Sequence, residues 1–367
     1  MRALIASSST GGHIYPALAV AEEIENRDPG AEILFVGTKW EISKDIVKAS
    51  GYRQAFIEAD GIDRKNPIKN IKVFAGLLKS SGEIKKILNE FSPDVVIGSG
   101  GYVSGPVLRV AKRKGYRTIL MEQNVIPGLA NKIAEKYADH IFVAFDETVK
   151  QFKEPDKVVV SGNPVRAAFT EAAKKRDGLR EKYGVPKGAL CVLVFGGSQG
   201  SGAINDAGVS LIEGICGREG SYVILITGRQ LYEAAKARLE DGPATGGRGY
   251  AVIDYSDTIY ELFATADVIV SRAGALTVTE IALCGKASIL VPSPNVTNNH
   301  QYYNAKVLAD AGAAVLLQEE ELGSGRLLET VLELEADRSK LGEMSRKAAE
   351  TAKPDAALVI ADEIFRS

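Results

Sequence analysis

Short apolar runs alternate with helical segments along the whole chain. Residues 3–6, 32–36 and 94–97 have the composition and length of strands, and the helical segments at residues 17–24 and 71–88 lie between them. This alternation is typical of βαβ units, in which parallel strands are joined by helices. It predicts further strands at residues 118–120, 140–144, 158–160, 191–195, 222–227, 251–253, 266–270, 287–291 and 314–317, and helices at residues 17–24, 108–112, 128–137, 203–215, 275–283 and 354–365.

The alternation restarts in the middle of the chain. A polar, charged segment at residues 171–188 precedes a second series that opens as the first does, with a strand, a glycine turn and a helix. A chain of 367 residues is also long for one ordinary domain and fits two. We therefore predict an α/β protein with two doubly wound, Rossmann-like parallel-sheet domains, at residues 1–163 and 164–353, and a final amphipathic helix at 354–367.

Glycine-rich turns follow several predicted strands. The turn at residues 271–274 ends at a predicted helix, and the free N–H groups of a positive helix end suit a phosphate. Glu280, further along that helix, can accept hydrogen bonds from both hydroxyls of a ribose. The alternative interpretation is that the glycine of the turn serves packing and that Glu280 is a surface residue without a ligand. Four glycines between residues 98 and 105 predict a loop that lets a ligand approach the backbone. Ligands of α/β proteins bind at such carboxyl ends of strands.

Composition and missing motifs exclude several classes of function. A net charge of −2 does not indicate a nucleic-acid binder, and three cysteines without CxxC argue against a disulfide frame or structural zinc. The first turn lacks GxGxxG, and the chain lacks GxxxxGK[ST] and DxD. These absences disfavour a dinucleotide site, ATP hydrolysis and a metal-bridged diphosphate. Without a signal peptide or a run of roughly 20 apolar residues, we expect a cytoplasmic protein.

Two features permit more than one interpretation. His13 lies where the first helix is expected to begin, so it can be an acid–base group, a phosphate donor or a helix-end histidine without chemical role. Residues 71–88 carry apolar side chains at helical spacing between lysines. Such a stripe can lie on an anionic bilayer or pack into a core.

Seven motifs then resemble one family almost from end to end. The chain resembles the GT-B glycosyltransferases of family 28 that make lipid II, in which two Rossmann-like domains face each other across a cleft. That resemblance rests on TGGHIYPALAVA, GSGGYVSGP, EQN, GNPVR, FGGSQG, SRAGALTVTE and HQYYNA, at residues 10–21, 98–106, 122–124, 162–166, 195–200, 271–280 and 300–305.

The resemblance implies an activity. The implied reaction is inverting transfer of N-acetylglucosamine from UDP-N-acetylglucosamine to the muramyl 4-hydroxyl of undecaprenyl-linked lipid I. This reaction would serve peptidoglycan synthesis and cell-wall biogenesis, and hence cell shape and cell division. No cofactor, metal or nucleic acid is implied. Expected partners are the two substrates, an anionic membrane surface and other cell-wall synthesis proteins, and the expected location is the cytoplasmic face of the cell membrane, as a peripheral protein. The last helix is expected to cross back onto the first domain.

The resemblance also implies roles for individual residues. The general base is expected to be His13, with Glu122 as the competitor. The acceptor side is expected to include Gly101, Tyr102 and Ser104. Donor binding is expected from Thr10, Gly11, Gly12, Asn124, Arg166, Ser198, Gln199, Ile253, Ala275, Leu276, Thr277, Glu280 and Gln301, and membrane contact from Lys65, Lys69, Ile71, Lys72, Phe74 and Leu78.

The chain departs from the family pattern at two places. Met121 stands where a histidine usually precedes EQN, and residues 7–9 are serines where glycines usually precede TGGH. Methionine cannot share a proton, so an acid–base role at position 121 is in doubt. The alternatives are a GT-B enzyme with another lipid acceptor, a UDP-N-acetylglucosamine 2-epimerase, a noncatalytic nucleotide-binding protein and a dinucleotide oxidoreductase.

Overall fold

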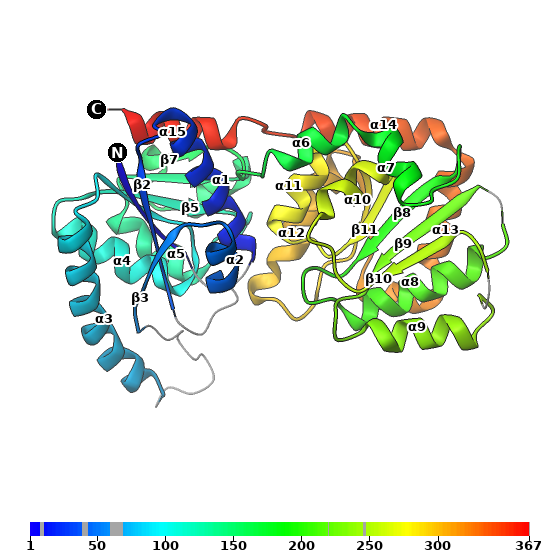
Figure 1. Cartoon of the computed structure of the whole chain (residues 1–367), viewed down its shortest axis with the longest axis horizontal. Coiled ribbons are helices and arrows are strands. Elements are labelled where there is room, and N and C mark those ends of the chain that lie inside the picture. Colours follow the sequence, from blue (N-terminus) through cyan, green and yellow to red (C-terminus); the bar gives the residue numbers. More distant parts are fainter. Residues whose placement is uncertain (8–10, 39–42, 59–68, 219, 245–246, 367) are drawn as a thin grey trace. The chain divides into compact units, whose positions relative to one another are not determined.

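The computed structural model describes residues 1–7, 11–38, 43–58, 69–218, 220–244 and 247–366, with the backbone alone at 43–44 and 69–79. The chain forms two compact units (Figure 1). Unit 1 comprises Met1–Arg166 and Lys353–Ser367, and unit 2 comprises Ala167–Ala352. This division lies three residues beyond the boundary expected from the sequence. The intervening segment is held to unit 1, because Asn163 Nδ2 donates to the Gln123 carbonyl at 3.2 Å and the Arg166 guanidinium lies 4.4 Å from the centre of the Tyr15 ring.

Unit 1 contains, within its described residues, a seven-stranded sheet in the order β3-β2-β1-β4-β5-β6-β7, and all its neighbouring strands are parallel. The order reverses between β1 and β4, which is the doubly wound arrangement. The strands are β1 (Arg2–Ala6), β2 (Glu32–Gly37), β3 (Arg53–Phe56), β4 (Val95–Gly98), β5 (Arg117–Glu122), β6 (His140–Val143) and β7 (Val158–Val160).

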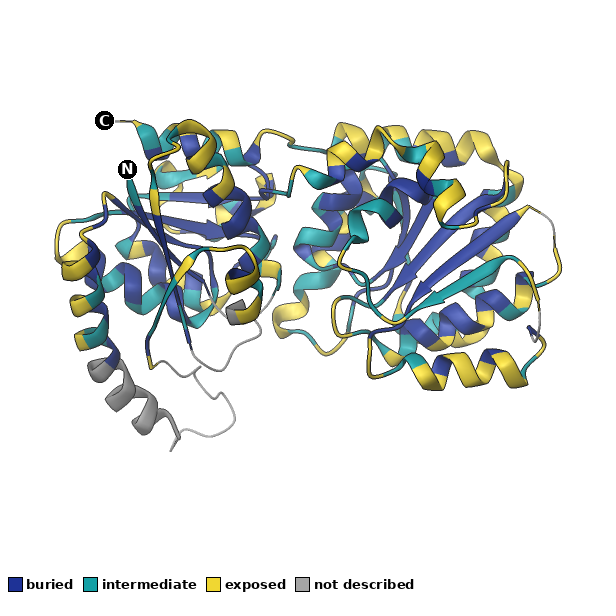
Figure 2. Cartoon of the chain, viewed as in Figure 1, coloured by how far each residue is buried: buried dark blue, intermediate teal, exposed yellow. Residues whose placement is uncertain are grey.

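Helices cover both faces of this sheet. Because side chains alternate along a strand, Leu4 and Ala6 pack with residues of α3 and α4, whereas Ala3 and Ile5 pack with residues of α1 and α15. The central strands are accordingly mostly buried, whereas the edge strands β3 and β7 and the outer helix surfaces are partly exposed (Figure 2). The helices are α1 (Gly11–Arg27), α2 (Ser43–Ala49), α3 (Lys69–Phe91), α4 (Gly101–Arg113), α5 (Leu129–Ala134) and α15 (Ala356–Phe365), with 3-10 turns η1 (Glu135–Tyr137), η2 (Asp146–Gln151) and η3 (Pro155–Lys157).

Unit 2 repeats the arrangement with a parallel sheet that has six strands in the described part of the chain, in the order β10-β9-β8-β11-β12-β13. Its strands are β8 (Leu190–Phe195), β9 (Ser221–Ile226), β10 (Tyr250–Ile253), β11 (Val268–Ser271), β12 (Ala287–Leu290) and β13 (Ala314–Leu316). Its helices are α6 (Ala168–Ala173), α7 (Arg176–Lys182), α8 (Gly202–Ile215), α9 (Tyr232–Asp241), α10 (Ile259–Thr265), α11 (Ala275–Leu283), α12 (His300–Asp310), α13 (Arg326–Ala336) and α14 (Arg338–Glu350), with 3-10 turns η4 (Thr297–Asn299) and η5 (Glu319–Ser324).

The structure confirms the predicted fold class and corrects three local predictions. The loop predicted at residues 98–106 is wrong, because α4 begins at Gly101 immediately after a tight turn with φ of +107° at Gly100 and +77° at Gly101. The first helix begins at Gly11, before the predicted range of 17–24, and His13 lies in its first turn. The edge strand β3 was not predicted.

The C-terminal helix α15 packs against α1 of unit 1. Ile360 and Ile364 are buried in the same apolar cluster as residues of α1, and Arg27 donates to Asp362 at 2.6 Å. Arg117 donates to the carbonyls of Glu363, Ile364 and Arg366 at the end of the helix. A cation at that position neutralises the negative end of α15.

Candidate functional site

The carboxyl ends of β4 and β5 in unit 1 carry a closed ring of hydrogen bonds. His13 Nδ1 lies 2.8 Å from Gln123 Oε1, and Gln123 Nε2 donates to the Ser99 carbonyl at 3.0 Å. The ring closes because Ser99 Oγ donates to the His13 carbonyl at 2.6 Å. Gln123 and Ser99 are buried, whereas His13 is partly exposed. The imidazole is therefore held through Nδ1, while the residue as a whole stays partly exposed.

The turn before α4 is shaped to receive this imidazole. A Cβ on Gly100 would lie 2.5 Å from His13 Nδ1, so only glycine fits there. Ser104, predicted on the acceptor side, is buried and holds this turn, since its hydroxyl accepts from Gly100 N at 2.9 Å. Tyr102 is half-buried, with its hydroxyl 3.5 Å from Thr38 Oγ1.

Glu122, the other predicted base, is buried and its carboxylate is occupied. Oε1 accepts from the backbone and side-chain amides of Asn124 at 2.9 and 3.1 Å, and Oε2 accepts from Gly128 N and Asn131 Nδ2 at 3.1 and 2.8 Å. Glu122 therefore fixes the loop after β5, including Asn124, whose side chain is predicted to reach the sugar.

Met121 does not face this group of polar residues. Its side chain is 2% exposed and packs in the apolar cluster that contains Ile119 and Phe142. The position that differs from the family pattern is thus a core position of β5 in this chain.

In unit 2, the glycine-rich turn after β8 is held against the loop after β9. A Cβ on Gly200 would lie 2.1 Å from the Thr227 carbonyl, and one on Gly228 would lie 2.6 Å from the Gln199 carbonyl. Gly200 also has a φ of +78°. This contact between backbones fixes Ser198 and Gln199, the predicted diphosphate contacts, at the carboxyl end of the sheet.

The SRAG turn after β11 is fixed by its arginine. The Arg272 guanidinium donates to Ser201 Oγ at 2.9 Å and to the carbonyls of Val291 and Pro292 at 3.3 Å, and it forms an ion pair with Glu319. Arg272 thereby joins the two glycine turns of unit 2. The predicted donor contacts Ala275, Leu276 and Thr277 form the first turn of α11, with Gly274 as its N-cap; Glu280 is 9% exposed on the same helix.

Two other predicted donor contacts already have partners within unit 2. The Ile253 carbonyl accepts from Thr227 N at 3.0 Å and from Thr227 Oγ1 at 3.3 Å, and Gln301 Oε1 accepts from Ser293 N at 2.9 Å. The Ile253 carbonyl is therefore already used at the edge of the sheet, where β10 pairs with β9. Gln301 retains its Nε2 as a donor.

The largest pKa shift of a lysine lies at the opposite end of this sheet. Lys286 Nζ is buried and donates to the carbonyls of Ala264 and Ala266 at 3.1 and 2.7 Å. Burial lowers the pKa of Lys286 to about 8 and raises the pKa of the neighbouring Cys284 to about 12.

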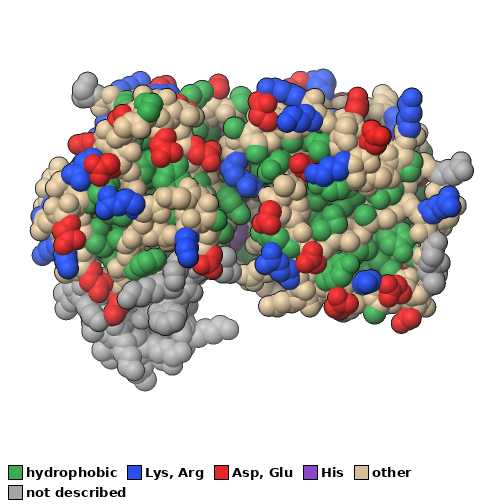
Figure 3. All heavy atoms as spheres, viewed as in Figure 1, with side chains coloured by type: hydrophobic (Ala, Val, Ile, Leu, Met, Phe, Trp, Pro, Cys, Tyr) green, Lys and Arg blue, Asp and Glu red, His purple; other side chains and the backbone are tan. Residues whose placement is uncertain are grey.

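Charges on the surface are mixed, with both signs interspersed over the visible face of each unit (Figure 3).

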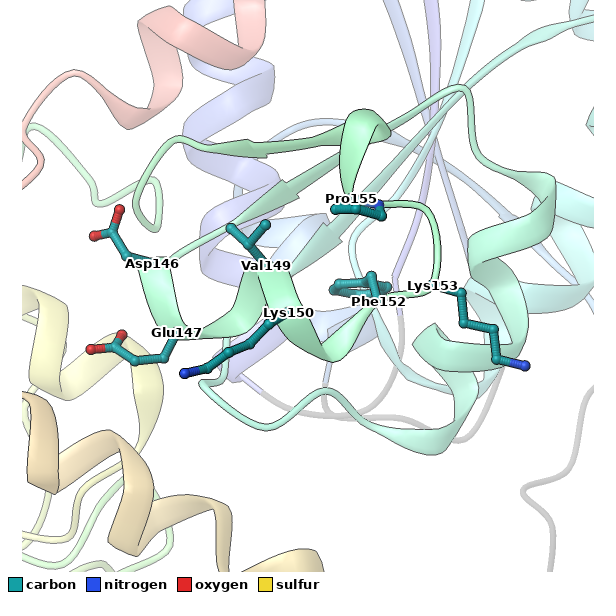
Figure 4. Close-up of a pocket in the computed structure, with 7 residues that line it drawn as sticks. All are labelled: Asp146, Glu147, Val149, Lys150, Phe152, Lys153 and Pro155. Carbon is teal, nitrogen blue, oxygen red and sulfur yellow. The ribbon is translucent and has the colours of Figure 1, made fainter.

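Some predicted residues fall outside these clusters. Thr10 and Lys65 lie outside the described residues, and Lys69, Ile71, Lys72, Phe74 and Leu78 belong to the part of α3 whose side chains are not described. Gly11 and Gly12 begin α1, beside His13. An open depression around η2 is lined by residues between Asp146 and Pro155 (Figure 4), and it includes no predicted site residue.

Sequence reasoning did not single out Ser99, Gln123 or Arg272. Gln123 lies inside the EQN motif, directly after a strand, and that position was the available signal. Ser99 and Arg272 lie likewise in glycine turns at strand ends. Their hydrogen bonds join segments far apart in sequence, so the motifs alone could not reveal them.

Comparison with known proteins agrees with both units. Residues 4–143 match the Glycosyltransferase family 28 N-terminal domain, and residues 191–360 match the Glycosyltransferase family 28 C-terminal domain. A relative from Finegoldia magna, named UDP-N-acetylglucosamine--N-acetylmuramyl-(pentapeptide) pyrophosphoryl-undecaprenol N-acetylglucosamine transferase, is 37% identical over 100% of this chain and 98% of its own. A Thermoanaerobacter relative of the same name is 39% identical over 97% of both chains.

Solved structures agree with this similarity. The crystal structure of Acinetobacter baumannii MurG matches with a TM-score of 0.77 at 28% identity, over 99% of both chains. A UDP-GlcNAc 2-epimerase from Neisseria meningitidis matches with a TM-score of 0.73 over 100% of both chains, but at 12% identity it shows a shared fold alone. The chain belongs to glycosyltransferase family 28, among the UDP-N-acetylglucosamine--N-acetylmuramyl-(pentapeptide) pyrophosphoryl-undecaprenol N-acetylglucosamine transferases.

Proposed function

We propose that this protein transfers N-acetylglucosamine from UDP-N-acetylglucosamine to undecaprenyl-pyrophosphoryl-N-acetylmuramyl-pentapeptide, converting lipid I into lipid II in peptidoglycan synthesis. The observation that carries the proposal is identity of 37–39% over essentially the whole chain with relatives that bear this name. The 2-epimerase alternative has only the shared fold in its favour.

The reaction is a single displacement with inversion. The muramyl 4-hydroxyl oxygen forms a bond to the anomeric carbon of N-acetylglucosamine as the bond from that carbon to the diphosphate oxygen breaks. The electron pair leaves with UDP, and the hydroxyl proton passes to a general base. We assign the base to His13, because its imidazole is partly exposed while the Glu122 carboxylate is occupied by four N–H donors.

The donor is assigned to unit 2. The first turn of α11 presents backbone N–H groups at its positive end, and these would stabilise the departing diphosphate. Ser198 and Gln199 belong to a turn that is rigidly braced by Gly200 and Gly228, which favours preorganised contacts over flexible ones. Within unit 2, Glu280 is proposed to hold the ribose hydroxyls and Gln301 the sugar. Asn124, which belongs to unit 1, is proposed as a further sugar contact.

We further propose that the protein works at the cytoplasmic face of the cell membrane, as a peripheral protein. No helix in the described ranges is both long and apolar enough to cross a bilayer. The proposed contact is the basic, apolar stretch that includes Lys65, Lys72 and Phe74. Its support is the alternation of lysines and apolar residues in the sequence together with a lipid-linked acceptor.

Transfer of radiolabelled N-acetylglucosamine from its UDP donor to a lipid I analogue, with EDTA present, tests the function. We expect labelled product with the wild-type protein and a large loss with His13→Asn at unchanged UDP affinity. Tight UDP binding without product would point to another lipid acceptor. Conversion of UDP-N-acetylglucosamine to its 2-epimer would support the epimerase instead.

A further inference from the structure

Among the residues that the structure describes, one buried side chain, that of Gln123, holds the imidazole of His13. Gln123 is 2% exposed, and its Oε1 lies 2.8 Å from His13 Nδ1. No carboxylate takes this position: Glu122, the adjacent residue on β5, gives its oxygens to Asn124, Gly128 and Asn131. The partner that orients the proposed base is therefore a neutral amide.

The second bond of Gln123 determines which way its amide points. The group 3.0 Å from its other terminal atom is the Ser99 carbonyl, which can only accept a hydrogen bond. The atom facing Ser99 must therefore be the amide nitrogen, and the atom facing His13 must be the oxygen. A flipped amide would bring two carbonyl oxygens together and lose this bond.

The orientation of the amide in turn fixes the histidine. Gln123 Oε1 can only accept, so His13 Nδ1 carries the proton in the neutral ring. The lone pair then lies on Nε2, at the opposite edge of the ring. Gly100 supports this placement, because any Cβ at that position would collide with Nδ1 at 2.5 Å. The same ring of bonds holds the backbone, through Ser99 Oγ and the His13 carbonyl at 2.6 Å.

From these contacts we propose that Gln123 is a positioning residue for the transfer reaction, which holds His13 as the Nδ1–H tautomer so that Nε2 accepts the proton of the acceptor hydroxyl. In this step the proton moves from the hydroxyl oxygen to Nε2, and Nδ1–H remains bonded to Gln123. The imidazolium that forms keeps the same bond, so no side chain has to reorient. The inference rests on the proposed function, in which His13 is the general base.

The tautomer can be observed without any activity assay. The chain contains three histidines, so protein labelled with ¹⁵N-histidine gives three ring patterns, and the one absent in His13→Asn identifies His13. We expect His13 as the Nδ1–H tautomer in the wild type. Gln123→Met, which matches the length of glutamine without its hydrogen bonds, should convert that signal to a mixture of tautomers.

A matched control distinguishes loss of the His13 orientation from a general loss of hydrogen bonds around His13. Ser99→Ala removes the hydroxyl that bonds the His13 carbonyl but retains the Ser99 carbonyl that orients Gln123. This variant should keep the Nδ1–H tautomer. If Gln123→Met does not fold, the spectra of the wild type and of Gln123→Glu still test whether His13 is held as the Nδ1–H tautomer.

Kinetics connect the tautomer to the reaction. Gln123→Met should lower kcat on the order of tenfold, a part of the 10²- to 10⁴-fold effect of a general base, with UDP affinity unchanged. Gln123→Glu places a carboxylate at Nδ1, where it stabilises the imidazolium electrostatically. The acidic limb of the kcat/KM profile should then move to higher pH by roughly one to three units.

Each outcome decides one question. An Nε2–H tautomer in the wild type, or an unchanged tautomer in Gln123→Met, would overturn the role of Gln123. A changed tautomer with unchanged kcat and pH profile would show that the orientation does not serve the reaction. Retained kcat in His13→Asn would instead remove the base assignment, and absence of transfer by the wild type would refute the proposed function while the tautomer result stood.

Discussion

Individual residues of this protein divide into those that hold loops and those that face solvent at the strand ends. Glu122 and His13 illustrate the difference, since sequence reasoning named both as candidate bases. The structure gives Glu122 four donors within its own loop, and it leaves His13 partly exposed. That distinction could not be predicted, because it depends on how the segment at residues 124–131 folds back over β5.

Replacing each candidate base with a neutral amide side chain should separate these roles. Glu122→Gln places an amide nitrogen opposite two N–H donors, which should cost about 2–3 kcal/mol of unfolding free energy and leave the acidic limb of the pH–rate profile in place. His13→Asn should lower kcat on the order of 10²- to 10⁴-fold with little change in stability. Chemical denaturation and pH–rate profiles of both variants measure this. The reverse pattern would make Glu122 the base.

Lys286 should make the stability of unit 2 depend on pH. Its pKa is about 8 in the folded protein, against the ordinary 10.5, because burial disfavours the ammonium. Below pH 8 both states carry the charge and the folded state bears the full penalty. Between pH 8 and 10.5 the folded state has released a proton that the unfolded state retains, so stability rises with pH.

The comparison with Lys286→Met isolates this contribution. Between pH 7 and 9.5 the free energy of unfolding of the wild type should rise by about 2 kcal/mol relative to the variant. Urea denaturation at several pH values provides the measurement. Parallel curves for the two proteins would show that Lys286 remains charged when folded.

At the scale of elements, apolar runs bounded by turn residues were predicted well. The strand Val158–Val160 and the helix Ala275–Leu283 coincide with their predictions. The strand Arg53–Phe56 was missed because a four-residue edge strand with a mixed Arg-Gln-Ala-Phe sequence has no apolar run. The α4 start was mistaken for a loop because two consecutive glycines with positive φ make the turn, after which the helix begins at once.

Two glycines that follow β8, Gly200 and Gly202, should tolerate an added side chain to different degrees. Gly200→Ala would bring a Cβ to within 2.1 Å of the Thr227 carbonyl and impose strain at a φ of +78°. We expect calorimetry to show at least about a tenfold loss of UDP affinity, equivalent to about 1.4 kcal/mol. Gly202→Ala is the matched stability control, since a Cβ there meets nothing within 4 Å. Equal unfolding temperatures for both variants, together with equal UDP affinity, would contradict the proposed bracing.

At the scale of the whole molecule, the chain forms most of unit 1, then all of unit 2, and its last segment belongs to unit 1 again. Sequence reasoning could place two domains because the strand–glycine–helix opening occurs twice. It could not derive from residue pattern alone which unit the last helix serves, since an amphipathic helix can cover either sheet. The structure packs α15 on α1, with Arg117 at its carboxyl end.

This return makes unit 1 depend on residues that follow unit 2. Deleting residues 354–367 removes four buried side chains, Ala356, Ile360, Ala361 and Ile364, and exposes the face of α1 beneath them. We expect a loss of about 5 kcal/mol or more in unit 1, which is comparable with the whole stability of many domains. Unit 2 should still unfold cooperatively and bind UDP, because the described residues of its apolar core include none from α15.

Point variants on the same helix test this without truncation. Ile364→Ala should destabilise unit 1 by about 2–5 kcal/mol, because Ile364 is 3% exposed and its loss leaves a cavity. Leu358→Ala, at a position 43% exposed on the same helix, should stay within about 0.5 kcal/mol of the wild type. Scanning calorimetry with and without UDP assigns each transition, since UDP should raise only the transition of unit 2. If Ile364→Ala lowered the UDP-sensitive transition as much as the other, α15 would stabilise the chain as a whole rather than unit 1.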